Sequence, residues 1–190
     1  MAELYCLLSI IGSHAGEEMD TIFNRKIGDI TKVGKTFWLV KSYMAKPPIV
    51  QEICKKAIRS GQKSIKCYFI TPSTPLSAAP TKTANIAKQF SYNQNEWEDL
   101  PEGIGPVTGN INSSSYALVL EKIVLYLMPI DLTQYAFFVN PDIPIRMKQG
   151  ASTICAIQKN MRDNPNVMKS YSRTIVAVGT MLSPYCVWLR

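Results

Sequence analysis

The stretch Lys35-Thr36-Phe37-Trp38-Leu39-Val40-Lys41-Ser42 carries the β-branched and aromatic residues that are typical of a strand. Pro47-Pro48 then opens a predicted helix, which Gly61 is well placed to end. The run Ser64-Ile65-Lys66-Cys67-Tyr68-Phe69-Ile70 predicts a second strand, which a proline-rich loop follows. This strand-helix-strand unit predicts an α/β (or α+β) fold in which helices cover a sheet.

The segments beside this unit extend the same pattern. Residues 4–11 form a continuous apolar run, which predicts a strand that is covered on both faces. A short helix is expected from Glu17, with Arg25 and Lys26 near its end, where cations complement the helix dipole. Residues 28–36 are then expected to form a turn into the next strand. A further helix is expected over 81–90.

The second half of the chain is predicted to be rich in strands. Residues 116–127 have the composition of a long or bent strand. Residues 93–112 show no clear periodicity and are expected to form a long loop. The chain is expected to be a single domain over 1–190, with a possible subdivision into a basic α/β half (1–92) and a β-rich half (113–190). Shorter strands are expected at 135–139, 153–157, 173–178 and 184–189.

Composition indicates a globular protein, since 46% of the residues are hydrophobic and 18% are charged. No apolar run reaches the roughly 18 residues that a membrane-spanning helix needs, so we expect no membrane association. The five cysteines are odd in number and widely spaced among apolar neighbours. They are expected to be reduced core thiols of a cytoplasmic protein.

The net charge of +7 is unevenly distributed. Residues 21–92 contain thirteen Lys or Arg against two acidic residues, a local balance of +11, whereas residues 93–102 contain four acidic residues and no base. A concentrated block of cations attracts polyanions and supports salt-dependent binding. The sequence therefore favours a protein that binds nucleic acid, a nucleotide or another polyanion, by backbone contact more than by base readout.

The outer face of the predicted 47–61 helix is the first place to look for such a site, because its cations project together opposite an apolar stripe. The competing interpretation is a solvated helix face with no ligand. The candidate anion-binding residues are Lys41, Lys46, Lys55, Lys56, Arg59, Lys63, Lys66, Lys82 and Lys88. Tyr92 and Trp97 are candidates for stacking against a base.

Catalytic signatures are sparse. Gly34-Lys35-Thr36 ends like a phosphate-binding P-loop, but Asp29 stands where that motif needs glycine, and a strand follows where it needs a helix. His14 is the only histidine and is the one candidate for a His-based mechanism. No Cys-x-x-Cys or multi-histidine set exists, so no metal site and no cofactor are predicted.

Two further classes of function stay open. One is an enzyme acting on nucleic acid or nucleotides, with His14 or the acidic residues of the second half, such as Glu121 and Asp131, at its centre. The other is an interaction or assembly protein, viral or from a mobile element, in which the apolar content and the three tryptophans serve a homo-oligomer interface.

Overall fold

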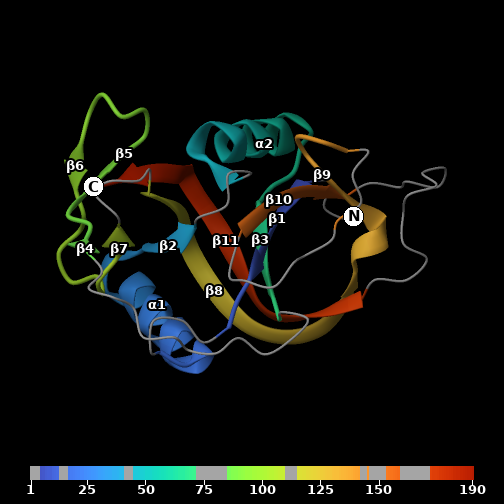
Figure 1. Cartoon of the computed structure of the whole chain (residues 1–190), viewed down its shortest axis with the longest axis horizontal. Helices are drawn as coiled ribbons and strands as arrows, with labels where there is room; N and C mark the ends of the chain where they lie inside the picture. The colour runs from blue at the N-terminus through green and yellow to red at the C-terminus, as the bar shows by residue number, and fades with distance from the viewer. Residues whose placement is uncertain are drawn as a thin grey trace.

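A computed structural model of the chain describes residues 5–12, 17–40, 45–71, 85–109, 115–141, 145, 153–158 (backbone only) and 172–190. It is a mixed α/β structure in which one large sheet is accompanied by two α-helices (Figure 1). The helices are α1 (Met19–Val33), α2 (Pro47–Arg59) and the short 3-10 helix η2 (Leu132–Gln134). The strands are β1 (Tyr5–Ile10), β2 (Thr36–Val40), β3 (Lys66–Ile70), β4 (Asn85–Ile86), β5 (Gln89–Ser91), β6 (Glu98–Asp99), β7 (Thr108–Gly109), β8 (Ser115–Asp131), β9 (Tyr135–Phe137), β10 (Thr153–Gln158) and β11 (Ser172–Leu189).

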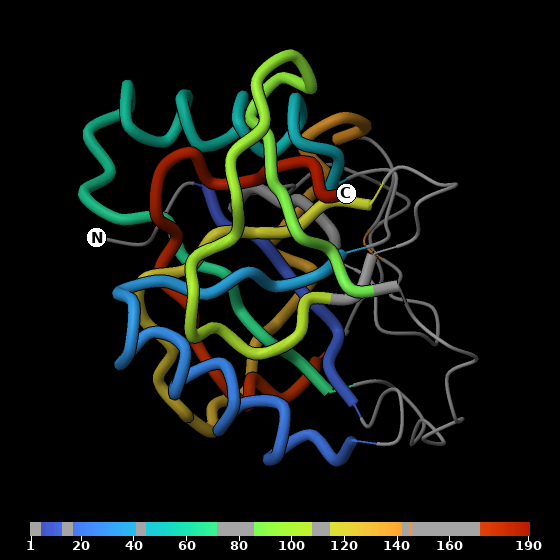
Figure 2. The backbone as a smooth tube through the Cα atoms, turned by 90° about the vertical axis from the view of Figure 1, so that its left-hand side faces the viewer, coloured from blue at the N-terminus to red at the C-terminus, as the bar shows by residue number. Residues whose placement is uncertain are grey.

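The main sheet has the strand order β2-β8-β11-β3-β1-β10-β9. Its pairings are antiparallel except that of β1 with β3, which is parallel. The long, curved strands β8 and β11 run side by side through its middle (Figures 1 and 2). The first-half strands β3 and β1 lie between two pairs of second-half strands, β8 with β11 and β10 with β9, so the two halves build one sheet.

Both α-helices pack against the same face of this sheet. Phe23 of α1 and Val50 of α2 belong to one buried cluster with Trp38 of β2 and Phe69 of β3. The rings of Phe23 and Phe69 meet edge to face at a centroid distance of 5.5 Å, and the ring centroids of Trp38 and Phe69 lie 4.3 Å apart. Aromatic side chains contribute the largest buried areas in a core, so this cluster holds both helices to the sheet.

The opposite face of the sheet carries two smaller clusters. One gathers Leu8, Ile70 and Ile175 with Leu132 of η2. The other packs Phe37 against Phe90 and other side chains of the 87–107 region. Side chains alternate between the two faces along a strand, which is why Leu7 and Leu8 enter different clusters.

The strand-helix-strand prediction for 35–75 is confirmed as β2, α2 and β3, and the strand-rich second half is confirmed as well. However, β2 and β3 are not neighbours, because β8 and β11 lie between them. The two segments predicted at 173–178 and 184–189 are parts of the single strand β11.

Two sequence predictions are wrong. Helix α1 continues through Gly28 to Val33, so the turn before β2 is limited to Gly34 and Lys35. Gly34 has φ 77°, the left-handed conformation that suits a glycine at a helix end. The cost of about 1 kcal/mol for glycine within a helix is outweighed by the packing of Ile27 and Ile30 on the core.

The helix predicted over 81–90 is also wrong in the part that the structure describes, which forms β4 and β5 instead. Ala87 and Phe90 are buried, as the apolar spacing suggested. Phe90 is buried where β5 pairs with β11, opposite Leu189, and Ala87, which lies between β4 and β5, packs in the same cluster. A three-residue apolar spacing fits a helix and an irregular extended segment equally well, and long-range pairing decided between them.

Candidate anion-binding surface

Helix α2 turns most of its apolar side chains toward the sheet and its cations toward solvent, although the apolar Ile58 is also 50% exposed. Val50, Ile53, Cys54 and Ala57 are buried against the sheet. The opposite side of the helix exposes three cations, and these residues, which we name the α2 cationic face, are Lys55, Lys56 and Arg59. At 3.6 residues per turn they lie within little more than one turn of each other, so the sequence prediction for this helix is confirmed in its geometry.

The cations of this face have few partners in the described part of the chain. Lys56 Nζ lies 3.4 Å from a carboxylate oxygen of Glu52 and 4.8 Å from the centroid of the Phe138 ring. The Lys56 and Glu52 side chains are 49% and 59% exposed, so solvent screens this pair strongly. Among the described residues no carboxylate forms an ion pair with Lys55 or Arg59.

Two more predicted cations flank this face. Lys46 is the N-cap residue of α2, and Lys63 follows the helix; both are exposed. A rise of 1.5 Å per residue puts the backbone at Lys46 about 20 Å from that at Arg59. The two lysines can therefore extend a cationic track beyond either end of the α2 cationic face.

Lys66 does not lie with them. On β3, Cys67 and Phe69 face the helices, whereas Tyr68 and Ile70 face the other side of the sheet, and Lys66 shares the direction of Tyr68. Its Nζ donates a 2.9 Å hydrogen bond to Thr180 Oγ1 on β11. The sequence analysis grouped Lys66 with the cations of α2, but the alternation of side chains along β3 places it on the opposite face of the sheet.

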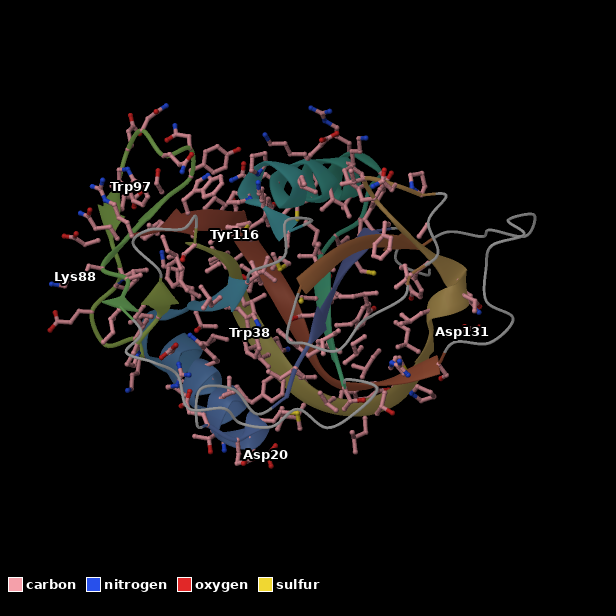
Figure 3. The ribbon with its side chains drawn as sticks, in the orientation of Figure 1. Asp20, Trp38, Lys88, Trp97, Tyr116 and Asp131 are labelled. Carbon is pink, nitrogen blue, oxygen red and sulfur yellow. The ribbon has the colours of Figure 1, made fainter. Side chains whose placement is uncertain are left out.

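Lys88 also lies away from α2. It lies at the β4–β6 end of the molecule, on the left of Figure 3 where Trp97 is also labelled, whereas α2 covers the top. The other predicted residues, Lys41, Lys82 and His14, lie outside the described residues.

The two aromatic candidates differ in accessibility. The guanidinium carbon of Arg190 lies 4.1 Å from the Trp97 ring centroid, and Trp97 Nε1 donates to the Gln94 carbonyl at 3.1 Å. One face of Trp97 is thus occupied by a cation. Tyr92 is 44% exposed, so its ring is more accessible to a base than that of Trp97.

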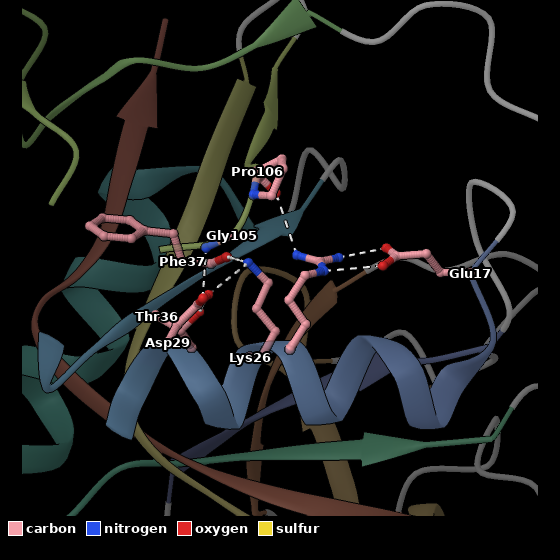
Figure 4. Close-up of polar contacts among 8 residues, drawn as sticks. Glu17, Lys26, Asp29, Thr36, Phe37, Gly105 and Pro106 are labelled. Atoms are coloured by element: carbon pink, nitrogen blue, oxygen red, sulfur yellow. Dashed lines mark hydrogen bonds and ion pairs between the residues drawn. The ribbon is translucent and has the colours of Figure 1, made fainter. Parts of the chain in front are cut away.

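A buried polar network, drawn in Figure 4, joins α1 to β2 and to the 103–107 segment. Asp29 accepts hydrogen bonds from Thr36 Oγ1 and from the Gly105 amide, each at 2.7 Å. Lys26 Nζ lies 3.7 Å from Asp29 and donates to the Phe37 carbonyl at 2.7 Å. These contacts satisfy the buried charges and tie three segments together.

Burial lowers the pKa of Lys26 to about 8, and the neighbouring charge of Arg25 acts in the same direction, while Asp29 opposes them. The sequence prediction placed Lys26 near the end of a short helix, where its charge would complement the helix dipole, and so missed this network; the helix continues to Val33 and buries Lys26 in its middle. The spacing of these residues could have predicted the network. Lys26 follows Ile22 by four residues and precedes Asp29 by three, so all three lie on the same, buried side of the helix.

Arg25, which precedes Lys26 on the same helix, is also engaged. It makes two hydrogen bonds to the Glu17 carboxylate, at 3.1 and 2.6 Å, and a longer one of 3.4 Å to the Pro106 carbonyl (Figure 4). A Cβ on Gly105 would lie 2.9 Å from the Arg25 side chain, which shows how closely the 103–107 segment approaches α1.

The described residues contain little that could act in catalysis. Asp131 accepts hydrogen bonds from the amide and hydroxyl of Thr133, at 3.0 and 2.7 Å, and these bonds lower the pKa of its carboxyl group. Burial raises the pKa of the Cys54 thiol to about 12 and raises the pKa values of Cys67 and Cys186, which keeps these thiols protonated. Within the described residues no three His, Cys, Asp or Glu side chains are grouped to hold a metal ion.

Comparison with family models, curated proteins and solved structures yields no match to this chain. Neither α1 nor α2 is long and apolar enough to cross a lipid bilayer, and the same holds for every helix in the described part of the chain.

Proposed function

We propose that the protein binds nucleic acid or a similar polyanion through the α2 cationic face. The observation that carries the proposal is the contrast between this face and the two adjacent cations in the middle of α1. Lys55 and Arg59 are exposed without an ion-pair partner in the described residues, whereas Arg25 and Lys26 are bound to structural partners. Cations that are not used to hold the fold are available to a ligand.

The packing of α2 against the sheet supports this proposal. The apolar side of α2 packs against the central strands through Val50, Ile53 and Ala57, each almost fully buried. The cationic side chains therefore project from a helix whose backbone is fixed. A fixed row of charges binds a polyanion with a smaller ordering cost than charges on a mobile loop.

The same surface favours phosphate contact over base readout. Glu52 is the only acidic residue of α2, so the face carries a net positive charge. Lysine and arginine contacts to phosphates position a nucleic acid without reading its sequence. We therefore expect binding to depend strongly on salt and weakly on sequence.

A matched pair of double variants tests this proposal. Lys55→Gln with Arg59→Gln removes two charges from the α2 cationic face, and Lys32→Gln with Lys122→Gln removes two exposed charges elsewhere. Fluorescence anisotropy measures the affinity of each variant for mixed-sequence duplex and single-stranded oligonucleotides over a range of salt concentrations.

The first variant is expected to lower the slope of log affinity against log salt by about 2 for a duplex, since each lost phosphate contact removes roughly 0.9. The second variant is expected to retain most of the wild-type slope. Absence of binding by the wild type at low salt would refute the proposal. So would an equal loss in both variants, because that result assigns the attraction to net charge rather than to this face.

A further inference from the structure

The middle of β8 exposes an unusual run of large apolar side chains. Val124, Leu125, Tyr126, Leu127 and Met128 are 44%, 53%, 52%, 79% and 38% exposed, and we name them the β8 apolar segment. The other four exposed large apolar side chains in the described residues are isolated from one another in the sequence. Single exposed apolar residues are ordinary, whereas a contiguous group marks an interaction site.

This segment also lies at a sheet edge. Strand β8 pairs with β2 on one side as far as Leu120, opposite Thr36, and with β11 on the other side along its whole length. The pairing with β2 ends at Leu120. From Glu121 to Asp131 that edge of β8 has no paired strand in the described part of the chain. In Figure 1 this part of β8 follows the lower rim of the molecule, with β11 along its inner side.

The exposed side chains point to both faces of the sheet. Val124 lies opposite Val178, which packs on the face away from the helices, and Leu125 lies opposite Ala177, which belongs to the helix-side cluster. A flat surface such as a lipid headgroup layer could cover one of these faces only. A β-strand added at the edge can cover both, and it also pairs with the backbone amides and carbonyls of the edge.

We infer that the occupant is the same segment of a second copy, paired antiparallel across a two-fold axis near Leu127. In such a pairing apolar side chains meet apolar side chains, for example Tyr126 opposite Met128 of the second copy. The antiparallel direction also separates like charges. With this centre Glu121 and Lys122 stand opposite the uncharged Thr133 and Leu132, whereas a parallel in-register pairing would place each of them beside its own copy. Dimers of this kind are isologous and continue one sheet into the next.

The apolar surface area that two β8 apolar segments can bury limits the strength of the dimer. Aromatic side chains bury about 150–250 Å² in full and aliphatic ones less, so five side chains that are about half exposed, of which only Tyr126 is aromatic, supply less than about 500 Å² per copy. A stable interface needs about 800 Å² per partner. We therefore expect a reversible dimer that forms at micromolar concentrations rather than a permanent one, and this inference does not depend on polyanion binding.

Sedimentation velocity over about 1 µM to about 1 mM protein tests the inference, since dissociation constants of transient dimers fall in this range. The wild type is expected to change from monomer to dimer. Leu127→Lys places a charge on the edge and is expected to stay monomeric with unchanged thermal unfolding, because Leu127 is mostly exposed. Ile58→Lys, at a 50% exposed apolar position on α2, is the matched control and is expected to dimerise like the wild type.

Crosslinking tests the geometry separately. Leu127→Cys is expected to form a covalent dimer under mild oxidation, because side chains near a two-fold axis approach their own copies. Ile58→Cys is expected to remain uncrosslinked. A wild type that stays monomeric at the highest concentration, or a dimer that Leu127→Lys leaves intact, would overturn the inference. A monomer that binds phosphatidylcholine vesicles through Leu127 would overturn it in favour of lipid.

Discussion

Two helices pack against one face of the same sheet, and each carries a lysine-carboxylate pair, but the pairs have opposite surroundings. Lys26 and Asp29 of α1 lie 3.7 Å apart with side chains 7% and 3% exposed. Lys56 and Glu52 of α2 lie 3.4 Å apart with about half of each side chain exposed. The distances are nearly equal, so burial and the additional hydrogen bonds distinguish the pairs.

The difference shows why a count of charges does not locate a binding surface. Both helices belong to the same basic half of the chain. On α1 two of the three cations hold the fold, since Lys26 donates to the Phe37 carbonyl and Arg25 to the Glu17 carboxylate, and only Lys32 is exposed. On α2 the cations contribute little to the fold and remain available to a ligand. Three predictions separate the two pairs further.

The largest effect is expected for Asp29→Ala. The substitution leaves the Lys26 ammonium buried without its partner and removes the acceptor for Thr36 and for the Gly105 amide. Breaking a buried ion pair costs about 3–5 kcal/mol. Urea denaturation should therefore show a free energy of unfolding lower by this amount. A loss below about 1 kcal/mol would show that the network contributes no more than a surface pair does.

The second prediction concerns pH. Because the pKa of Lys26 is lowered from 10.5 to about 8, the unfolded chain holds a proton above pH 8 that the folded protein has released. Stability from this group therefore rises with pH between about 8 and about 10.5. Over the interval from pH 8 to pH 9, Lys26 alone is expected to raise the free energy of unfolding by about 1 kcal/mol.

The buried thiols act in the opposite direction over the same interval. Burial raises the pKa of Cys54, Cys67 and Cys186 above the usual 9.0, so as the pH approaches 9 the unfolded chain loses these protons first and stability falls, by about 1 kcal/mol for the three together. The Lys26 contribution is therefore measured as a difference between proteins. Between pH 8 and pH 9 the wild type is expected to gain about 1 kcal/mol relative to Lys26→Met, whereas Lys56→Met is expected to change like the wild type. Free energies of unfolding from urea denaturation at the two pH values measure both. An equal change in the wild type and in Lys26→Met would contradict the assignment.

The smallest effect on stability is expected for Glu52→Ala. This exposed pair should contribute no more than about 0.5 kcal/mol to the free energy of unfolding. The same substitution removes the only acidic residue of α2, so the affinity for an oligonucleotide should increase while stability stays nearly constant. Anisotropy titration and thermal unfolding of one sample check both parts. Loss of stability comparable with that of Asp29→Ala would erase the distinction between the pairs.

The sequence was most informative where structure depends on short-range patterns. The strand composition around Trp38, the two prolines before Ile49 and the apolar stripe of α2 predicted β2 and α2 and the outward direction of Lys55 and Arg59. It was misleading at 81–90, where Phe90 is buried by pairing with β11, and at Gly28, which packing keeps within α1. Both errors arise because contacts distant in the sequence outweigh local preference.

Local patterning was sufficient for the α/β class and for the cationic side of α2, because a periodic apolar stripe dictates which side of a helix meets the core. Tertiary structure alone decided the rest. It placed Lys66 on the face opposite α2, buried Lys26 beside Asp29, and left the β8 apolar segment at an edge after β2 ends. Each of these outcomes depends on strand order and register, which arise from contacts between segments far apart in the chain.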